Sequence, residues 1–429
     1  MIPILELTGL PAEKILSRDI RDSLPQIDAA VDAILADVRD NGDAALRKYA
    51  LQFDGVALDA LTVSEAEMEE AMASVDEAFL ETLRRAAANI REFHEKQVHE
   101  DFTIRRPDGC VLGQRWTPIE RVGVCVPGSP ETFPSTVLMD VIPAKIAGVR
   151  QTIMVTPPAK DGTIRPEALA AARIAGVDTI VKAGGAQGVA ALAFGTESVP
   201  RVDKIVGPGG LFVATAKRKV FGKVDIDMIA GPSEILVLAD GKCDPRWVAA
   251  DLLSQAEHDV MASAVLVTES RELALAVQEE LERQLQQLPR QNVARQSIDE
   301  NGKILIAADL QQALEAVNAI APEHLELCVD DPFALLGEIR NAGSVFLGRH
   351  VPEALGDYYG GPNHTLPTSG TARFSSPLGV DDFVKRSSFL YYTPEALAEC
   401  APRIADFAER EGLHAHARSV LIRSETTEG

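Results

Sequence analysis

The few histidines of this chain indicate where a metal ion could bind. There are eight among 429 residues. The stretch WVAADLLSQAEHD has a helical pattern, which places Gln255 and His258 three residues apart on one helix face. Nitrogen and oxygen donors without a thiolate suit zinc or manganese, and Asp357 and His416 are plausible further ligands. The spacing alone still favours a surface glutamine and histidine on an amphipathic helix.

A carboxylate and an imidazole are adjacent in the stretch APEHLEL, at Glu323 and His324. Pro322 favours the start of a helix, so both residues are expected in its first turn. Imidazole is the side chain best suited to proton transfer near neutral pH, and the neighbouring carboxylate could share that work. A charged first turn stabilised by the helix dipole explains the same residues equally well.

Two other positions are candidates for chemistry. His364 lies in the loop GPNHTLPT, and polar loop residues of this kind often line sites. The oxidation of an aldehyde to an acid can pass through a thiohemiacetal on a cysteine, and Cys125 precedes a Pro-Gly turn, but a buried strand residue is the favoured interpretation. Three further histidines, His94, His99 and His350, are interpreted as surface residues.

Three glycine-rich turns follow predicted strands: VPGS at 126–129, AGGAQG at 183–188 and GPGG at 207–210. Backbone N–H groups at the start of a helix can bind phosphate, and glycine allows close approach. None of the three matches a dinucleotide fingerprint or a Walker A loop. Tight strand-to-helix turns therefore explain them as well as a nucleotide site does.

These residues must be positioned by an α/β fold. From about residue 120, nine short runs rich in Val and Ile alternate with helical stretches such as 165–175 and 271–287. This alternation predicts two parallel sheets covered by helices, that is, two Rossmann-like domains. We expect a helical N-terminal region and, from about residue 381, a C-terminal helical tail.

Local patterns within the first hundred residues support helices there. Ser64 with Glu67 and Ser74 with Glu77 form capping-box patterns that each open a helix. An apolar stripe then predicts a core-facing side for the second helix, made of Phe79, Leu83, Ala86, Ile90 and Phe93.

The composition excludes several classes of protein. Net charge is −22, so a nucleic acid would be repelled, and Lys217-Arg218-Lys219 is expected to be a solvated helix face. We expect no membrane span and no secretory signal. Five scattered cysteines without a CxxC pair indicate reduced thiols in the cytoplasm.

Long ordered motifs resemble the histidinol dehydrogenase family over nearly the whole chain. They are GGAQ with ALAFGTESVP, GPGGLFVATAKR, AGPSE, SQAEHD, APEHLEL, GDYYGGPNHTLPTSGTARFSSPLGVDDF and EGLHAH. The resemblance implies NAD-dependent four-electron oxidation of L-histidinol to L-histidine through an enzyme-held aldehyde, in the last steps of histidine biosynthesis. It also implies a homodimer in which the tail is exchanged.

The same resemblance assigns roles to residues. It implies one zinc ion (Zn2+) per subunit, which orients the substrate, and Glu323 and His324 as the acid–base pair. Gln187 would contact NAD. Four residues would bind both the zinc ion and the substrate, namely Gln255, His258, Asp357 and His416. The substrate would also contact His324 and three residues outside the metal site, Ser233, His364 and Glu411.

Two positions depart from the family pattern, and both concern the nucleotide. Cys125 stands where the family has a tyrosine, and Gly210 where it has an asparagine. Losing one aromatic contact and one hydrogen bond could weaken cofactor binding by a few kcal/mol, on the order of magnitude of such contacts.

Three functions are alternatives to the one that the resemblance implies. They are an NAD- and zinc-dependent dehydrogenase of another primary alcohol, a zinc hydrolase if NAD does not bind, and a non-enzymatic zinc-binding dimer.

The predicted domains follow from these patterns. Residues 1–20 form an N-terminal arm, and residues 21–125 with 235–380 form a discontinuous catalytic α/β domain. Residues 126–234 form an inserted α/β domain on the nucleotide and substrate side. Residues 381–429 form the helical tail.

Overall fold

The computed structural model describes residues 1–10, 25–128 and 132–424. The chain divides into two compact units, Met1–Gln97 with Ile119–Phe383, and Val98–Pro118 with Val384–Gly429. Within the described residues, no helix is long and apolar enough to cross a membrane.

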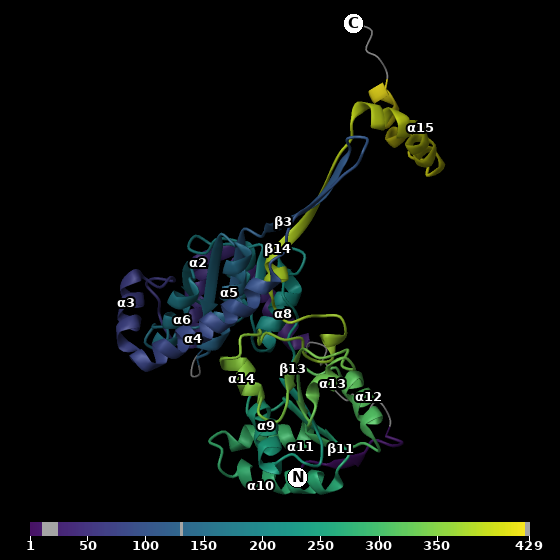
Figure 1. Ribbon diagram of the computed structural model, residues 1–429. Coiled ribbons are helices and arrows are strands. Elements are labelled where there is room, and N and C mark those ends of the chain that lie inside the picture. The colour runs from purple at the N-terminus through teal and green to yellow at the C-terminus, as the bar shows by residue number, and fades with distance from the viewer. Residues whose placement is uncertain (11–24, 129–131, 425–429) are drawn as a thin grey trace. The chain divides into compact units, whose positions relative to one another are not determined.

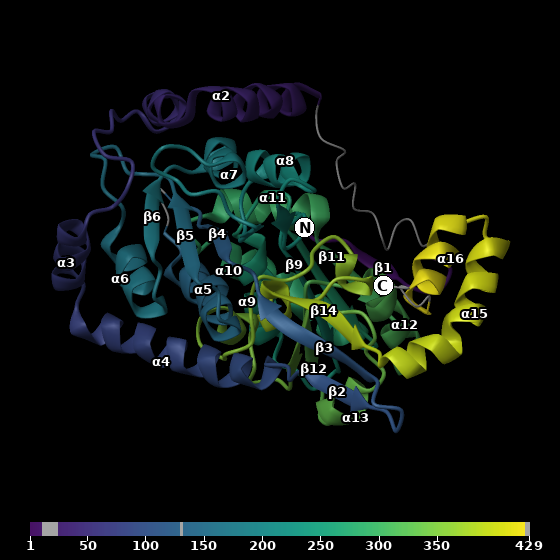
Figure 2. The same cartoon turned by 90° about the horizontal axis from the view of Figure 1, so that it is seen from above.

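The first unit contains a parallel five-stranded sheet. In spatial order its strands are β6 (Thr179–Lys182), β5 (Gln151–Thr156), β4 (Arg121–Cys125), β7 (Lys204–Val206) and β8 (Asp225–Ile226). Helices cover both faces of this sheet (Figure 2). They are α2 (Pro25–Tyr49), α7 (Gly185–Phe194) and α8 (Leu211–Val220) on one face, and α4 (Glu77–His94), α5 (Pro134–Ala147) and α6 (Pro166–Ala175) on the other.

A second parallel sheet in the same unit has six strands. In spatial order they are β1 (Ile4–Glu6), β11 (Lys303–Ile306), β10 (Ser263–Thr268), β9 (Glu234–Ala239), β12 (His324–Cys328) and β13 (Ser344–Leu347). One face packs on α9 (Pro245–Ala256), α10 (Arg271–Leu285) and α11 (Gln291–Asn301), and the other packs mainly on α12 (Leu310–Ile320) and the segment around α13 (Pro332–Leu336).

The two parallel sheets share one connection order. In each, the first strand of the repeat is central (β4 or β9), the next two lie outward on one side, and the following two lie on the other side. Each sheet therefore has a topological switch point beside its central strand. The α/β fold and all nine predicted strands are confirmed. The prediction succeeded because continuous β-branched runs are the signal of strands buried on both faces.

The second unit contains an antiparallel sheet and two helices. Strand β3 (Val111–Pro118) lies between β2 (Phe102–Arg105) and β14 (Val384–Tyr391), and α15 (Pro394–Arg410) and α16 (His414–Leu421) follow. Figure 1 shows these strands as a long ribbon that leads to α15. The predicted helical tail is confirmed from residue 394, but helix was the wrong prediction for residues 384–391.

Some local predictions about α4 differ from the structure. Ser74 ends α3 (Glu65–Ser74), and the cap of α4 is Asp76, which accepts from the backbone N–H of Phe79 at 2.9 Å. Aspartate is as good a cap as serine, and it directly precedes the helix. The Ser64–Glu67 capping box is present. Phe93 is 42% exposed, although the rest of its stripe packs inward.

Two basic side chains predicted at the surface are buried. His94 lies inside the first unit and its Nδ1 is 2.8 Å from Gln97 Oε1. Lys217 pairs with Asp227, and its side chain is only 3% exposed, whereas Lys219 on the same helix forms a more exposed pair with Asp32. The lysine cluster is therefore only partly a solvated face.

Sheet membership also differs from the predicted division of the chain. Strand β4 lies at the centre of the five-stranded sheet, and α2 and α4 pack on that sheet. The prediction placed residues 21–125 with the six-stranded sheet instead. The described part of the predicted arm, residues 1–10, contributes β1 to the six-stranded sheet, and residues 11–20 lie outside the described part.

Candidate active site

Glu323 and His324 lie at the start of a strand, not in a helix. Helix α12 ends at Ile320, Ala321 adopts a left-handed conformation (φ 53°), and β12 begins at His324. The predicted helical first turn is therefore wrong. Pro322 follows the helix end, where proline is common because it cannot continue the helix.

The pair sits beside the first residue of β9. Glu234 N–H donates to Glu323 Oε2 at 2.8 Å, and Glu323 N–H donates back to Glu234 Oε2 at 3.3 Å. Burial raises the pKa of Glu323 to about 8, with the charge of Glu234 adding to the rise and His324 opposing it. This carboxyl group is thereby suited to proton transfer near neutral pH.

The two nitrogens of His324 have different surroundings. Nδ1 is 2.9 Å from the backbone oxygen of Glu234, which can only accept, so Nδ1 carries a proton. Nε2 is buried without a hydrogen-bond partner among the described residues, 3.6 Å from Asp357 Oδ1. Burial opposes the charged ring, but the carboxylates of Glu323 and Asp357 outweigh it and raise the pKa of His324 to about 10.

A possible cation site lies on the Nε2 side. His258, Glu353 and Asp357 each offer one ligand atom, and these atoms all lie within 4.8 Å of one another. Gln255, in the last turn of α9, approaches His324 with its amide Nε2 3.1 Å from Nδ1. Imidazole and carboxylate donors around buried polar atoms fit a divalent cation such as zinc.

The helix expected to carry both Gln255 and His258 is shorter than predicted. It ends at Ala256, and His258 follows in a turn, where its N–H donates to Gln255 O at 3.2 Å. Glu353 was not predicted from the sequence. A signal existed, since Glu353 and Asp357 are four residues apart on the short helix α14 (Glu353–Tyr358) and so share one face.

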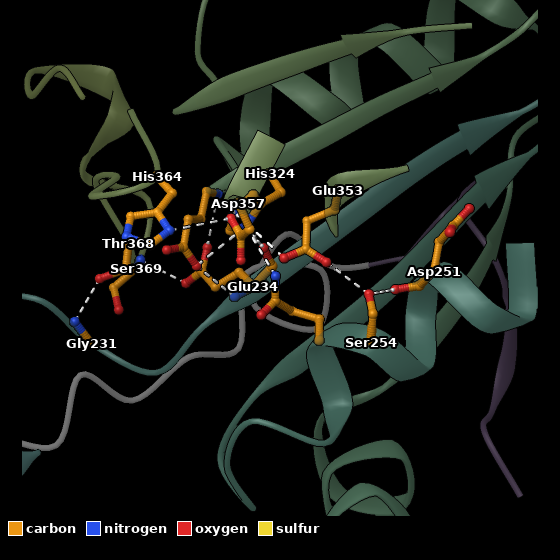
Figure 3. Close-up of polar contacts among 12 residues, drawn as sticks. Gly231, Glu234, Asp251, Ser254, His324, Glu353, Asp357, His364, Thr368 and Ser369 are labelled. Atoms are coloured by element: carbon orange, nitrogen blue, oxygen red, sulfur yellow. Dashed lines mark hydrogen bonds and ion pairs between the residues drawn. The ribbon is translucent and has the colours of Figure 1, made fainter. Parts of the chain in front are cut away.

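The loop that carries His364 joins this site to helix α5, which covers the five-stranded sheet. His364 Nδ1 lies 3.9 Å from Asp357 Oδ1 (Figure 3). On either side of it, Asn363 donates to Met139 O at 2.6 Å and Thr365 Oγ1 donates to Asp140 at 2.7 Å, both on α5. The site therefore lies where the amino ends of β9 and β12 meet the helices of the five-stranded sheet.

The remaining predicted residues are placed as follows. Ser233 is half-buried and directly precedes Glu234 at the start of β9. Glu411 and His416 belong to the second unit, at the end of α15 and in α16, and both are exposed. The structure thus brings together Gln255, His258, His324, Asp357 and His364 in the first unit.

The predicted nucleotide residues lie in the five-stranded sheet's turns. Gln187 is buried in the first turn of α7, and Gly184 and Gly210 precede α7 and α8. A Cβ added at Gly210 would meet no atom of the described residues within 4 Å, which leaves space at this helix start. Cys125 is buried at the end of β4, which is the interpretation that the sequence favoured. Burial raises the pKa of its thiol to about 12. Ser129 of the VPGS turn lies outside the described residues.

Comparison with known proteins identifies the family. The family model described as histidinol dehydrogenase matches residues 17–424. The chain belongs to the histidinol dehydrogenase family. It is 54% identical to the histidinol dehydrogenase of Listeria monocytogenes over 93% of each chain, and 52% identical to that of Bacillus subtilis over 95% of this chain and 96% of the relative.

A solved histidinol dehydrogenase agrees in fold. The crystal structure from Elizabethkingia anophelis is 36% identical, covers 98% of each chain and superposes with a TM-score of 0.93. As a histidinol dehydrogenase family member this chain is an NAD-dependent oxidoreductase. The paired Glu323 and His324 described above lie in the part of the chain that the family model matches.

Proposed function

We propose that this chain oxidises L-histidinol to L-histidine through L-histidinaldehyde, with two molecules of NAD. The observation that carries the proposal is the buried Glu323–His324 pair, whose unpartnered Nε2 faces a carboxylate-rich cation site. Each oxidation removes two electrons and releases one proton with one NADH. One water supplies the second carboxyl oxygen of the product.

Gln255, His258, Asp357 and His416 would hold one zinc ion per subunit. Bound there, zinc would anchor the imidazole and amine of the substrate, and its charge would offset the carboxylates that raise the pKa of His324. Ser233, His364 and Glu411 would complete the contacts to the substrate. Holding the end that does not react keeps the aldehyde bound between the two oxidations.

The chain's own residues account for the proton transfers. His324 Nε2 takes the hydroxyl proton of the alcohol, because Nδ1 already donates to the Glu234 carbonyl. Glu323 then takes a proton from water as the water oxygen bonds to the aldehyde carbon, and His324 returns its proton to the former carbonyl oxygen, which gives the hydrate. His324 is then free to take the proton of a hydrate hydroxyl in the second oxidation. The hydride of each oxidation would pass to NAD, and Gln187 and the glycine turns of the five-stranded sheet would be the contacts of NAD.

A homodimer that exchanges the second unit would bring in Glu411 and His416. This unit has a small core of Ala405, Ala408 and Ala417 with Leu421. Several of its larger apolar side chains, including Leu390, Tyr391 and Phe407, are exposed. Exposed apolar groups over so small a core favour association with a second chain. We place the reaction in the cytoplasm, which suits five free cysteines.

The test is the yield of NADH per L-histidinol consumed by the zinc-loaded protein. We expect two NADH, lost on chelation and restored by zinc. Turnover of a different primary alcohol in place of histidinol would favour the broader dehydrogenase function. Zinc binding without any NAD binding would favour a hydrolase.

A further inference from the structure

The backbone N–H, the backbone oxygen and the carboxylate of Glu234 each contact the acid–base pair or the neighbouring loop. Its N–H donates to Glu323 Oε2 at 2.8 Å, and its backbone oxygen accepts from His324 Nδ1 at 2.9 Å. Its side chain is buried in the first unit, and one carboxylate oxygen accepts from the N–H of Glu323 at 3.3 Å.

The other carboxylate oxygen holds the loop that carries His364. Ser369 N–H donates to Glu234 Oε1 at 2.6 Å (Figure 3). A second link joins the same two segments nearby, since Gly231 N–H donates to Thr368 Oγ1 at 2.6 Å. Both links connect the start of β9 to this loop, but only the Glu234 link also reaches Glu323.

The backbone and the side chain of Glu234 therefore make different contacts. The backbone N–H holds the Glu323 carboxylate and the backbone oxygen holds His324, whereas the side chain holds the backbone N–H groups of Glu323 and Ser369. The backbone carbonyl fixes the tautomer of His324, and no side-chain substitution removes it. The carboxylate fixes the backbone at Glu323 and the loop at Ser369. We propose that the Glu234 carboxylate is a positioning group for Glu323 and thereby controls hydration and oxidation of the aldehyde more than oxidation of the alcohol. This inference rests on the proposed role of Glu323 as the base for water.

A change of Glu234 to Gln isolates the side-chain function. Glutamine keeps the size but has one acceptor oxygen, whereas two backbone N–H groups need acceptors here. The contact to the N–H of Ser369 is shorter than that to the N–H of Glu323, so the glutamine oxygen is expected to stay on Ser369. The amide NH₂ group then faces the N–H of Glu323. The two N–H donors then face each other, and the backbone N–H of Glu323 loses its acceptor, whereas the backbone contact to the Glu323 carboxylate remains.

The experiment separates the two half-reactions on supplied L-histidinal. Reduction by NADH reports the first oxidation in reverse, and oxidation by NAD reports the second. We expect Glu234→Gln to slow aldehyde oxidation about tenfold or more while reduction changes less than about threefold, because a displaced base loses much of its catalytic contribution. Glu234→Asp keeps the charge but is one methylene too short, and should show the same selective loss.

Thr368→Val is the matched control, because it removes the other link between the same segments without touching Glu323. It should change both half-reactions by the same factor. Equal losses in both half-reactions for Glu234→Gln, as for Thr368→Val, would overturn the proposal and leave Glu234 as a loop anchor only.

Glu323→Gln is measured in parallel to test the premise. Selective loss of aldehyde oxidation in that variant, with no selective loss in Glu234→Gln or Glu234→Asp, would overturn the inference alone. No selectivity in Glu323→Gln would instead remove the proposed role of Glu323 and the inference with it. Thermal unfolding confirms that each variant is folded before its rates are compared.

Discussion

The hydroxyl of Thr365 donates to Asp140 Oδ1 at 2.7 Å, which fixes the loop of His364 to helix α5 inside the first unit. The other oxygen of Asp140 is buried without a hydrogen-bond partner among the described residues. Burial, with the charge of Asp227, raises the pKa of Asp140 to about 8 although Thr365 and Lys217 favour the charged form. Asp140 is therefore protonated in the folded protein at neutral pH.

Asp140→Asn should change the pH dependence of stability. In the unfolded chain the carboxyl ionises near pH 4, so between about pH 4 and pH 8 the folded state holds one more proton than the unfolded state. The contribution of Asp140 to the free energy of unfolding is thus largest at low pH. It falls as pH rises, by at most about 1.4 kcal/mol per pH unit.

Denaturant unfolding of both proteins at pH 5 to 8 measures this effect. Relative to wild type, Asp140→Asn should gain stability steadily as pH increases across that range. Parallel pH dependences in the two proteins would show that Asp140 is ionised in both folded and unfolded states.

Lys217→Met should destabilise the five-stranded sheet region strongly. Lys217 Nζ pairs with the buried carboxylate of Asp227 and donates to Gly207 O at 2.9 Å. Removing one partner leaves a buried charge uncompensated, which costs roughly 3–5 kcal/mol. Denaturant unfolding measures the loss, and Lys219→Met is the control, with an expected cost below about 1 kcal/mol for its more exposed pair. Equal losses in the two variants would contradict the role of burial.

The sequence predicted best those elements whose signal is local and continuous. The runs RVGVC and EILVLA are buried throughout or nearly so, and both form central strands. Strand β14 was missed because seven of its eight residues are exposed and it pairs with β3, more than 260 positions earlier in the chain. A strand whose partner is distant and whose faces are not buried leaves little periodic pattern.

The site was predicted in its side chains but not in its backbone contacts. Residue type and family motif indicated His324, yet Pro322 was assigned to the wrong end of a helix because proline suits both positions. The contribution of Glu234 depends on its N–H and carbonyl as well as its carboxylate. Backbone contacts of this kind depend on which strands become neighbours, and no local sequence pattern specifies that.

His416→Ala should weaken zinc retention at least about tenfold, if His416 supplies a ligand in the dimer. Zinc content after dialysis against graded chelator measures this without relying on activity. His414→Ala is the control, because it is an exposed histidine on the same helix, two positions away, where the side chains point to different sides. Equal zinc retention in His416→Ala and wild type would remove His416 from the ligand set.

Gly210→Asn should tighten NAD binding. Gly210 caps α8 with φ −64°, a conformation open to any residue, and within the described part of the chain an added Cβ would meet no atom within 4 Å. An asparagine there can cap the helix and offer its amide to a nucleotide at the helix start. We expect a several-fold lower Kd, because one net hydrogen bond contributes about 1 kcal/mol. Titration with NAD measures Kd directly, and Gly222→Asn, at a turn after α8, is a control that should leave it unchanged. An unchanged Kd in Gly210→Asn would mean that the nucleotide does not lie against this turn.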